Sequence, residues 1–300
     1  MALTPIAAAP RGPFGARSTA EDVTRGRDLS DQTILITGST SGIGLETARV
    51  LALRGAHVVA LGRNADKVRH ATEGFSGRIT PVGCNHEDFA AVAACAKDVA
   101  AHGPFDAVIA NAGILGQMEP EVIHGVAKPF AVNHLSHFIL VSRLLPALKL
   151  GGRVVVVSSE AHHRAPKEGI AFDNLAGEKG YRAMECYGQS KLANALFARF
   201  LARKGVAANA LHPGVIATNI FGTLPPLIGG LVALGRPFMK SVSQGAATMC
   251  YVATAPDLAG VAGVYFKDCN PAVPHPNAEN DGLADRLWAV SEDLTLPYLA

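Results

Sequence analysis

The segment that most constrains the fold is TILITGSTSGIG, residues 33–44, in which three glycines follow an apolar run and precede a segment with helical periodicity. A turn from a buried strand into a helix leaves free N–H groups at the positive end of the helix dipole, where a phosphate can bind. Gly38 allows a sharp turn, Gly42 lets a pyrophosphate approach the backbone, and Gly44 lets the helix pack against the sheet. The segment therefore predicts a dinucleotide site, with a plain turn of small residues as the alternative.

Three further residues of this turn are predicted to contact the same ligand. Ser39 and Ser41 carry hydroxyl donors, and Ile43 lies between the last two glycines. The spacing is T-G-x-x-x-G-I-G and not the commoner G-x-G-x-x-G. The expected ligand contacts are thus backbone N–H groups, supplemented by two serine hydroxyls.

Short apolar runs alternate with helical patterns through most of the chain, which predicts one α/β domain. Runs that are apolar along their whole length are typical of a parallel sheet buried on both faces. The expectation is a Rossmann-like, doubly wound sheet of about seven strands with helices on both faces. The expected strands cover residues 33–37, 56–61, 78–82, 105–110, 153–157, 206–211 and 263–266. The expected helices cover residues 42–54, 65–75, 87–102, 128–149, 186–203, 243–254 and 281–290.

Composition excludes several other classes of protein. The net charge of +2 argues against a nucleic-acid partner. No apolar run is long enough for a transmembrane segment, and the N-terminus lacks the apolar core of a signal peptide, so a cytoplasmic location is expected. The five cysteines show no CxxC pair, so no metal site is predicted. Residues 1–29 are interpreted as an N-terminal extension, and residues 30–300 as the domain, with a loop at about 216–241.

Further motifs follow in a fixed order along the chain. NAG (111–113) ends the fourth expected strand, VNH contains Asn133, and VSS (157–159) ends the fifth. YGQSK contains Tyr187 and Lys191, and HPGVIATN (212–219) follows the sixth strand. Together with the glycine turn, these motifs resemble those of the short-chain dehydrogenase/reductase family over about residues 30–290. The segments STAEDVTRGRDLS and KLANALFARFLA are most similar to the retinol-dehydrogenase-like and WW-domain-oxidoreductase-like branch.

The end of the second strand predicts NADP(H) as the preferred cofactor. Enzymes that select NAD carry a carboxylate here for the ribose hydroxyls, whereas a cation accepts the extra phosphate of NADP. This chain has Gly62 at that position, followed by Arg63 and Asn64, both expected to contact the cofactor. A solvated surface arginine and an NAD-dependent enzyme are the alternatives. The resemblance assigns an adenine contact to Asn85, where relatives usually carry an acid.

Tyr187 and Lys191 are four residues apart in a helical pattern, so their side chains lie on one face. Tyr187 is expected to act as general acid in reduction and base in oxidation, with Lys191 lowering the pKa of the tyrosine. The resemblance makes Ser159 the donor to the substrate oxygen and Asn133 the support of Lys191. Each residue alone has an ordinary structural interpretation, but their joint order favours catalysis.

The remaining site residues come from the resemblance alone. It implies cofactor contacts at the positions Asn111, Ala112, Gly113, Pro213, Gly214 and Thr218. It also implies a mobile lid after residue 216, in which Phe221 and Leu224 would line an apolar substrate chamber. His162 and His163 lie in the long segment between Ser159 and Tyr187, as substrate contacts or as ordinary loop residues.

The sequence therefore predicts an NADP(H)-dependent oxidoreductase that interconverts an apolar aldehyde or ketone with its alcohol. A non-catalytic nucleotide sensor or scaffold is the alternative from another class. By resemblance, two helices, near 128–149 and 186–203, would pair copies of the chain in a homodimer or homotetramer.

Overall fold

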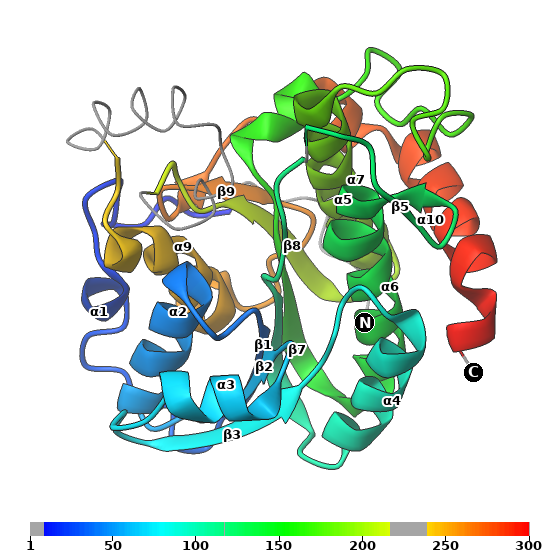
Figure 1. Ribbon diagram of the computed structural model, residues 1–300. Coiled ribbons are helices and arrows are strands. Elements are labelled where there is room, and N and C mark those ends of the chain that lie inside the picture. The colour runs from blue at the N-terminus through cyan, green and yellow to red at the C-terminus, as the bar shows by residue number, and fades with distance from the viewer. Residues whose placement is uncertain (1–8, 117, 217–238, 300) are drawn as a thin grey trace.

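A computed structural model describes residues 9–116, 118–216 and 239–299, and it contains the predicted doubly wound sheet (Figure 1). The eight strands lie in the order β10-β9-β8-β7-β4-β1-β2-β3, and all neighbours are parallel except β9 and β10. The strands are β1 (Thr33–Thr37), β2 (His57–Gly62), β3 (Arg78–Gly83), β4 (Phe105–Ala110), β7 (Leu148–Val157), β8 (Ala207–His212), β9 (Tyr265–Lys267) and β10 (Asn270–Pro271). A separate two-stranded ribbon joins β5 (Val122–Ile123) to β6 (Val126–Ala127).

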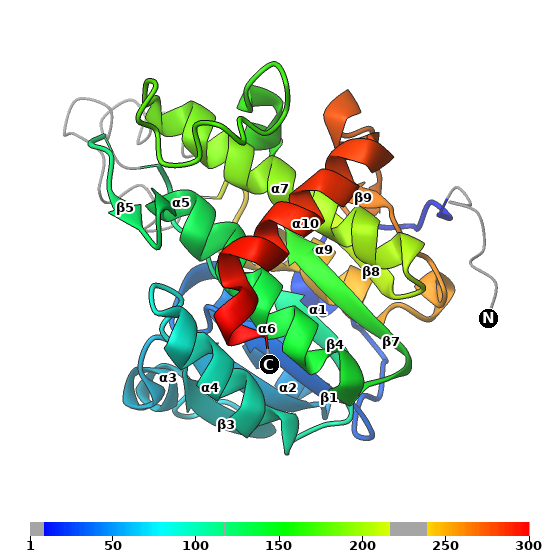
Figure 2. The same ribbon diagram turned by 90° about the vertical axis from the view of Figure 1, so that its right-hand side faces the viewer.

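Side chains of each central strand alternate between two apolar cores, as the pleat of a strand requires. In β1, Leu35 belongs to the core under one set of helices, while Ile34 and Ile36 belong to the other. The first core is covered by α4 (Phe89–Ala100), α6 (Ser136–Leu144), α7 (Ala183–Arg203) and α10 (Asp281–Thr295), which face the viewer in Figure 2. The second is covered by α1 (Ala20–Val23), α2 (Gly42–Leu53), α3 (Ala65–Ala71) and α9 (Val242–Thr254). The sheet is thus buried on both faces.

The strand order reverses next to β1, which fixes where a ligand can bind. The chain runs from β1 through β2 to β3 on one side, and then returns to β4 on the other side of β1. Leu35 pairs with Val108 and Ile36 with Ile109, so the carboxyl ends of β1 and β4 are neighbours. In open parallel sheets the crevice at this reversal is the usual ligand site.

The described part of the N-terminal extension packs on α2 and α9. Thr19 and Asp22 form a reciprocal capping box at the start of α1, and Ala20 and Val23 are buried. Glu21 accepts a hydrogen bond of 2.6 Å from Arg49 of α2. This segment is therefore part of the second core and does not hang free from the domain.

The expected helix over 128–149 differs from the structure at its end and in its middle. It comprises α5 (Lys128–Phe130), a π-helical turn (Ala131–Leu135) and α6, and it stops at Leu144 because Pro146 cannot continue a helix. The following strand accordingly begins at Leu148, earlier than expected. In the described ranges, none of the helices combines the length and apolar character needed to cross a membrane.

Candidate active site

The glycine turn after β1 is as close-packed as the sequence predicts. Gly38 has φ +74°, and a Cβ added there would lie 2.9 Å from Nδ2 of Asn111. A Cβ on Gly44 would lie 2.2 Å from the carbonyl oxygen of Gly38, a backbone atom that cannot move aside cheaply. Only glycine fits at either position, so the turn is held against the end of β4 by contacts that no larger residue allows.

The N-terminus of α2 is left open at this turn. Ser41 is the N-cap residue, yet its side chain makes no cap hydrogen bond within the described chain, and no acidic residue lies in the first turn of the helix. The first N–H groups of α2 are therefore available to an anionic ligand. The Ser39 hydroxyl differs from its expected role: it is buried and donates to the carbonyl of Ile36 at 3.1 Å, so it faces the protein interior.

A buried network ties the ends of β1 and β4 to the π-helical turn. The Thr37 hydroxyl accepts hydrogen bonds from the backbone N–H groups of Asn111 (2.9 Å) and Ala112 (2.8 Å). His137 contacts the carbonyl of Asn133 through Nδ1 (3.1 Å) and the Thr37 hydroxyl through Nε2 (2.9 Å). A carbonyl can only accept, so Nδ1 carries the proton and the hydroxyl donates to Nε2. Burial holds the pKa of His137 well below its ordinary value, which keeps this arrangement neutral.

His137 is a functional neighbour that sequence reasoning missed. It lies four residues after Asn133 on the same helical face, so the spacing alone contained the signal.

The structure brings Tyr187, Lys191, Asn133 and Ser159 together at the carboxyl edge of the sheet. The Lys191 ammonium donates to the carbonyl of Val157 at 3.1 Å and lies 5.8 Å from the centre of the Tyr187 ring. A Cβ on Gly113 would come within 3.1 Å of Asn133 Oδ1 and 3.3 Å of Lys191 Nζ. Gly113 therefore leaves the space in which the two polar groups approach each other.

Both polar atoms of the Asn133 side chain form hydrogen bonds with neighbouring segments. Its Oδ1 accepts from the N–H of Ile114 at 2.8 Å, and its Nδ2 donates to the carbonyl of Ile114 at 3.0 Å and to Ser190 Oγ at 2.9 Å. Ser190 in turn donates to the carbonyl of Tyr187 at 2.7 Å. Asn133 thus joins the segment after β4 to the helix that carries Tyr187.

Burial controls the electrostatics of the pair. It lowers the pKa of Lys191 to about 8, because the ammonium is removed from water. It raises the pKa of Tyr187 above the ordinary value, while a hydrogen bond with the Ser159 side chain acts in the opposite direction. The expected lowering by Lys191 is not among the causes of this shift; burial dominates, since only 8% of Tyr187 is exposed. Tyr187 is therefore a neutral phenol at neutral pH, the form that can donate a proton.

The ends of β2 and β3 form the other side of the crevice. A Cβ on Gly62 would lie 2.7 Å from Cγ2 of Thr40 and 2.6 Å from Cγ2 of Val68, so a carboxylate side chain does not fit there without displacing them. The Arg63 side chain is 72% exposed and forms an ion pair of 3.2 Å with Glu87. This end of β2 therefore presents a cation that is already paired with Glu87, and it carries no acid at position 62 itself.

Two asparagines at this side already have local partners. Asn64 caps α3, where its Oδ1 accepts from the N–H groups of Asp66 (2.7 Å) and Lys67 (3.2 Å). Asn85 Oδ1 accepts from the N–H of Glu87 at 3.3 Å. Among the described residues, the side-chain Nδ2 groups of Asn64 and Asn85 have no such bond and could donate to a ligand.

The later predicted residues are only partly described. Pro213 is buried after β8, and Gly214 has φ +108° with Lys240 packed where a Cβ would lie. Residues Thr218, Phe221 and Leu224 lie outside the described residues, as does most of the predicted lid. The described segments on either side of residues 217–238 are hydrogen-bonded to each other. The backbone N–H of Lys240 donates to the carbonyl of Val215 at 2.9 Å.

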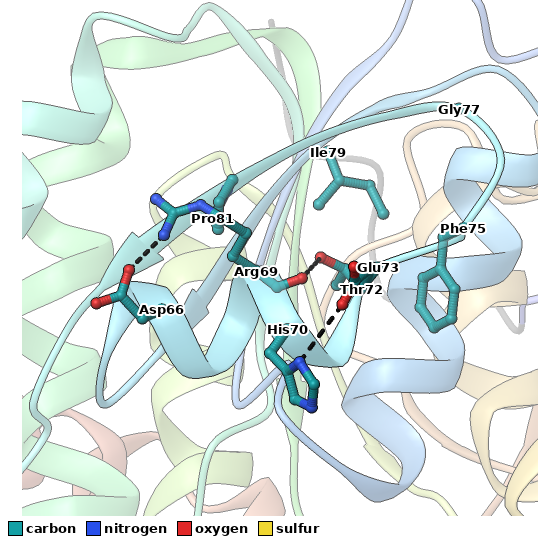
Figure 3. A pocket seen from close by; sticks show the side chains of 9 residues that line it. All are labelled: Asp66, Arg69, His70, Thr72, Glu73, Phe75, Gly77, Ile79 and Pro81. Carbon is teal, nitrogen blue, oxygen red and sulfur yellow. Dashed lines mark hydrogen bonds and ion pairs between the residues drawn. The ribbon is translucent and has the colours of Figure 1, made fainter.

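A separate hollow of about 500 Å³ lies between α3 and the edge strand β3 (Figure 3). Its polar side chains contact each other: Asp66 pairs with Arg69, and His70 Nδ1 lies 3.4 Å from the Glu73 carboxylate. Because these groups already have partners, the hollow presents few polar groups that could bind a ligand.

The open helix terminus at the strand reversal, with a buried tyrosine and lysine beside it, defines the class of dinucleotide-dependent α/β oxidoreductases. Comparison with known proteins identifies the family. The model for short chain dehydrogenases matches residues 32–226, and the chain belongs to this family. It is an NAD(P)-dependent enzyme acting on CH–OH groups, of the branch that includes retinol-dehydrogenase-like and WW-domain-oxidoreductase-like proteins.

Curated relatives cover most of the chain. Short-chain dehydrogenase TIC 32 B, chloroplastic, from Brassica napus is 39% identical over 93% of this chain and 93% of its own. The human WW domain-containing oxidoreductase is 35% identical over 94% of this chain and 72% of its own. An uncharacterised protein from Mycobacterium paratuberculosis has a similar structure, with a TM-score of 0.74 and 30% identity over 91% of this chain and 97% of its own.

Proposed function

We propose that the protein is an NADP(H)-dependent carbonyl reductase and alcohol dehydrogenase for apolar aldehydes and ketones, with Tyr187 as general acid/base. The observation that carries this proposal is the arrangement of three side chains at the carboxyl edge of the sheet: the buried Tyr187 is hydrogen-bonded to the partly exposed Ser159, and the buried Lys191 ammonium lies 5.8 Å from the centre of the Tyr187 ring. A nucleotide sensor would not need a neutral phenol held beside a serine hydroxyl and a lysine.

The described residues fit an NADP cofactor. The open N-terminus of α2 and the glycines that admit close approach would hold the pyrophosphate. Arg63 would bind the 2′-phosphate in exchange for its exposed ion pair with Glu87, because guanidinium groups bind phosphate bidentately and Gly62 places no carboxylate at the end of β2. Lys191 would bond the nicotinamide ribose. The bound cofactor supplies the hydride of the reaction.

The chain's own residues would control the proton. In reduction, the Tyr187 phenol donates its proton to the substrate oxygen, and the Ser159 hydroxyl donates a hydrogen bond to the same oxygen as negative charge develops on it. Lys191 stabilises the phenolate that remains, while Asn133 keeps the segment after β4 and the Tyr187 helix in register. In oxidation the phenolate takes the proton back.

Exposed apolar side chains near the start of α7, the helix that carries Tyr187, support an apolar substrate. Gly116 lies against the start of α7, since a Cβ on it would meet the carbonyl of Ala183. The neighbouring Met118 and Met184 are 67% and 47% exposed. Large exposed apolar groups near the start of the helix that carries Tyr187 favour an apolar ligand over a sugar or an acid. The assignment of Phe221 and Leu224 to the same chamber stays a prediction.

Replacement of Tyr187 by Phe tests the proposal. We expect NADPH oxidation with apolar aldehydes and ketones to fall about 1,000-fold in kcat, because the proton donor is lost. NADPH binding, measured by its fluorescence, should stay close to that of wild type. Equal turnover in the two proteins would contradict the role of Tyr187. Tight binding of NADPH without turnover of any substrate in the wild type would favour the sensor alternative.

The cytoplasmic location and the oligomeric state stay predictions. One relative is named as chloroplastic, and α10 covers part of the helix face expected to pair subunits. Trp288 of α10 stacks on Phe200 of α7 at 4.1 Å and packs edge-on against Phe138 of α6 at 4.7 Å. Light scattering after size exclusion would measure the assembly directly.

A further inference from the structure

We propose that His162 is a positioning residue, which ties the backbone of Ser159 to the C-terminal segment 268–280 and so holds the Ser159 hydroxyl beside Tyr187. This inference rests on the proposed function, in which Ser159 contacts the substrate oxygen. It replaces both sequence-based interpretations of His162, as a substrate contact and as an ordinary loop residue.

The His162 ring bridges two segments that are more than one hundred residues apart in the chain. Its Nδ1 lies 2.5 Å from the carbonyl oxygen of Ser159, and its Nε2 accepts the backbone N–H of His275 at 2.8 Å. The carbonyl can only accept and the N–H can only donate, so the ring is the neutral Nδ1–H tautomer. The side chain has no exposed surface. A buried ring with both nitrogens used in this way cannot bind substrate.

The surroundings of the ring favour the neutral form. The Tyr265 ring of β9 packs against it with centroids 4.9 Å apart, and the Tyr265 hydroxyl lies 3.4 Å from Nδ1. Glu160, His163 and His275 are the other titratable groups that act on it. Burial outweighs them and lowers the pKa of His162 to about 4.

The bridge ends on the backbone that orients the serine. The Ser159 carbonyl also accepts the N–H of His162 at 3.0 Å, while Ser159 Oγ accepts the N–H of Ala161 at 3.2 Å. These bonds fix the turn after β7 and leave the Ser159 O–H free to point at Tyr187. Without the ring, the turn would lose its hydrogen-bonded link to segment 268–280 through His275 and would keep, among the described residues, only the edge-on contact of the His163 and His275 rings at 5.7 Å, so the hydroxyl would be less well oriented.

The tautomer of His162 can be measured without any enzymatic activity. Long-range ¹H–¹⁵N correlation spectra of protein labelled at histidine, with His162 assigned by its absence from His162→Phe or His162→Asn, should show a neutral Nδ1–H ring at pH 7. An Nε2–H tautomer or an imidazolium would overturn the inference. Because this result does not depend on turnover, it stands apart from failure of the proposed function, which the Tyr187→Phe comparison detects.

Two replacements of His162 and one of His163 test the two hydrogen bonds of the His162 ring. His162→Phe keeps the ring and removes both bonds, His162→Asn places an amide N–H near the Nδ1 position, and His163→Phe is the matched control one residue away. We expect kcat to fall about 10- to 100-fold in His162→Phe, with KM and NADPH affinity within about twofold of wild type. His162→Asn should recover at least about threefold of the lost kcat, and His163→Phe should resemble wild type. Wild-type kcat in His162→Phe, or equal values in the Phe and Asn variants, would overturn the proposal.

Replacement of His275 tests the other end of the bridge, including the case in which His162→Phe fails to fold. His275 has φ −59° and ψ 139°, which proline can adopt. His275→Pro removes the N–H and the side chain, whereas His275→Ala removes the side chain alone. We expect kcat of the Pro variant to be about 3- to 10-fold below that of the Ala variant, with equal NADPH affinity. Equal kcat in both would overturn the proposal.

Discussion

Three helices begin at the same edge of the sheet, directly after β1, β2 and β3, and their N-termini differ. Asn64 caps α3 with bonds to two backbone N–H groups, and Asp88 caps α4 in the same way at 3.0 and 3.1 Å. The N-cap residue of α2, Ser41, makes no such bond within the described chain. Only the helix at the strand reversal therefore begins without a side-chain cap among these three.

This difference separates a structural helix terminus from one left for a ligand. A cap satisfies the free N–H groups and stabilises the helix by about 1 kcal/mol. At α2 the chain forgoes that stabilisation and instead places glycines where a ligand can approach the backbone. An anion bound there would take the place of the cap.

Gly44→Ala should have the largest effect on this arrangement. The added methyl group would lie 2.2 Å from the Gly38 carbonyl oxygen, so the turn must shift. We expect a loss of about 1–3 kcal/mol in the free energy of unfolding and about 100-fold in NADPH affinity. Urea denaturation and NADPH fluorescence measure the two quantities.

Gly282→Ala is the matched control, because Gly282 also lies in the first turn of a helix, α10. Its added methyl group would lie 3.5 Å from Asn280 Oδ1, an ordinary contact. This variant should be as stable as wild type or more stable by up to about 1 kcal/mol. Equal behaviour of the two variants would refute the special packing at Gly44.

Ser41→Asp should lower cofactor affinity while leaving the fold intact. A carboxylate at this position interacts favourably with the helix dipole, by about 0.3–1 kcal/mol, and repels a bound pyrophosphate. We expect NADPH to bind about 10-fold more weakly, with unchanged or slightly higher stability. Ser41→Asn, which is neutral and of the same size as Asp, is the control. A Ser41→Asp protein with wild-type affinity would show that the pyrophosphate does not bind at α2.

The cofactor side of the molecule was largely predictable from the sequence, because its elements are local. The glycine turn, the apolar strands and the Tyr187–Lys191 spacing each involve neighbouring residues, and the predicted fold is confirmed. The direction of the Ser39 hydroxyl was not predictable, since it depends on how the turn folds back on Ile36. Nor was the rise in the pKa of Tyr187, which comes from burial by distant segments.

The substrate side was less predictable, because long-range contacts build it. His162 meets His275, and Trp288 covers Phe138, across separations that no local pattern encodes. From the sequence alone, a substrate contact and an ordinary loop residue were both open for His162, because its bond to His275 spans more than one hundred residues. The end of α6 at Leu144, by contrast, was predictable from the sequence, because Pro146 cannot continue a helix.

Arg63→Ala should change cofactor preference by a moderate amount. The guanidinium is exposed and shared with Glu87, so its contribution to NADPH binding should be about 10-fold, with little effect on NADH. Arg69→Ala, on the exposed face of α3, is the control and should change neither affinity. Isothermal titration with both cofactors measures the preference. An equal loss for NADPH and NADH would assign Arg63 a structural role and remove the basis for NADP selection.

The smallest effects test the comparison of helix termini most directly. Asp88→Ala removes the cap of α4 and should cost about 1 kcal/mol in the free energy of unfolding, because two N–H groups lose their acceptor. Ser41→Ala removes no cap bond and should change stability by less than about 0.5 kcal/mol. For NADPH affinity the order reverses: Asp88→Ala should match wild type, and Ser41→Ala should bind a few-fold more weakly because a hydroxyl donor is lost. Equal stability losses would mean that Ser41 caps α2 in solution, so that its N-terminus is no more open to a ligand than that of α4.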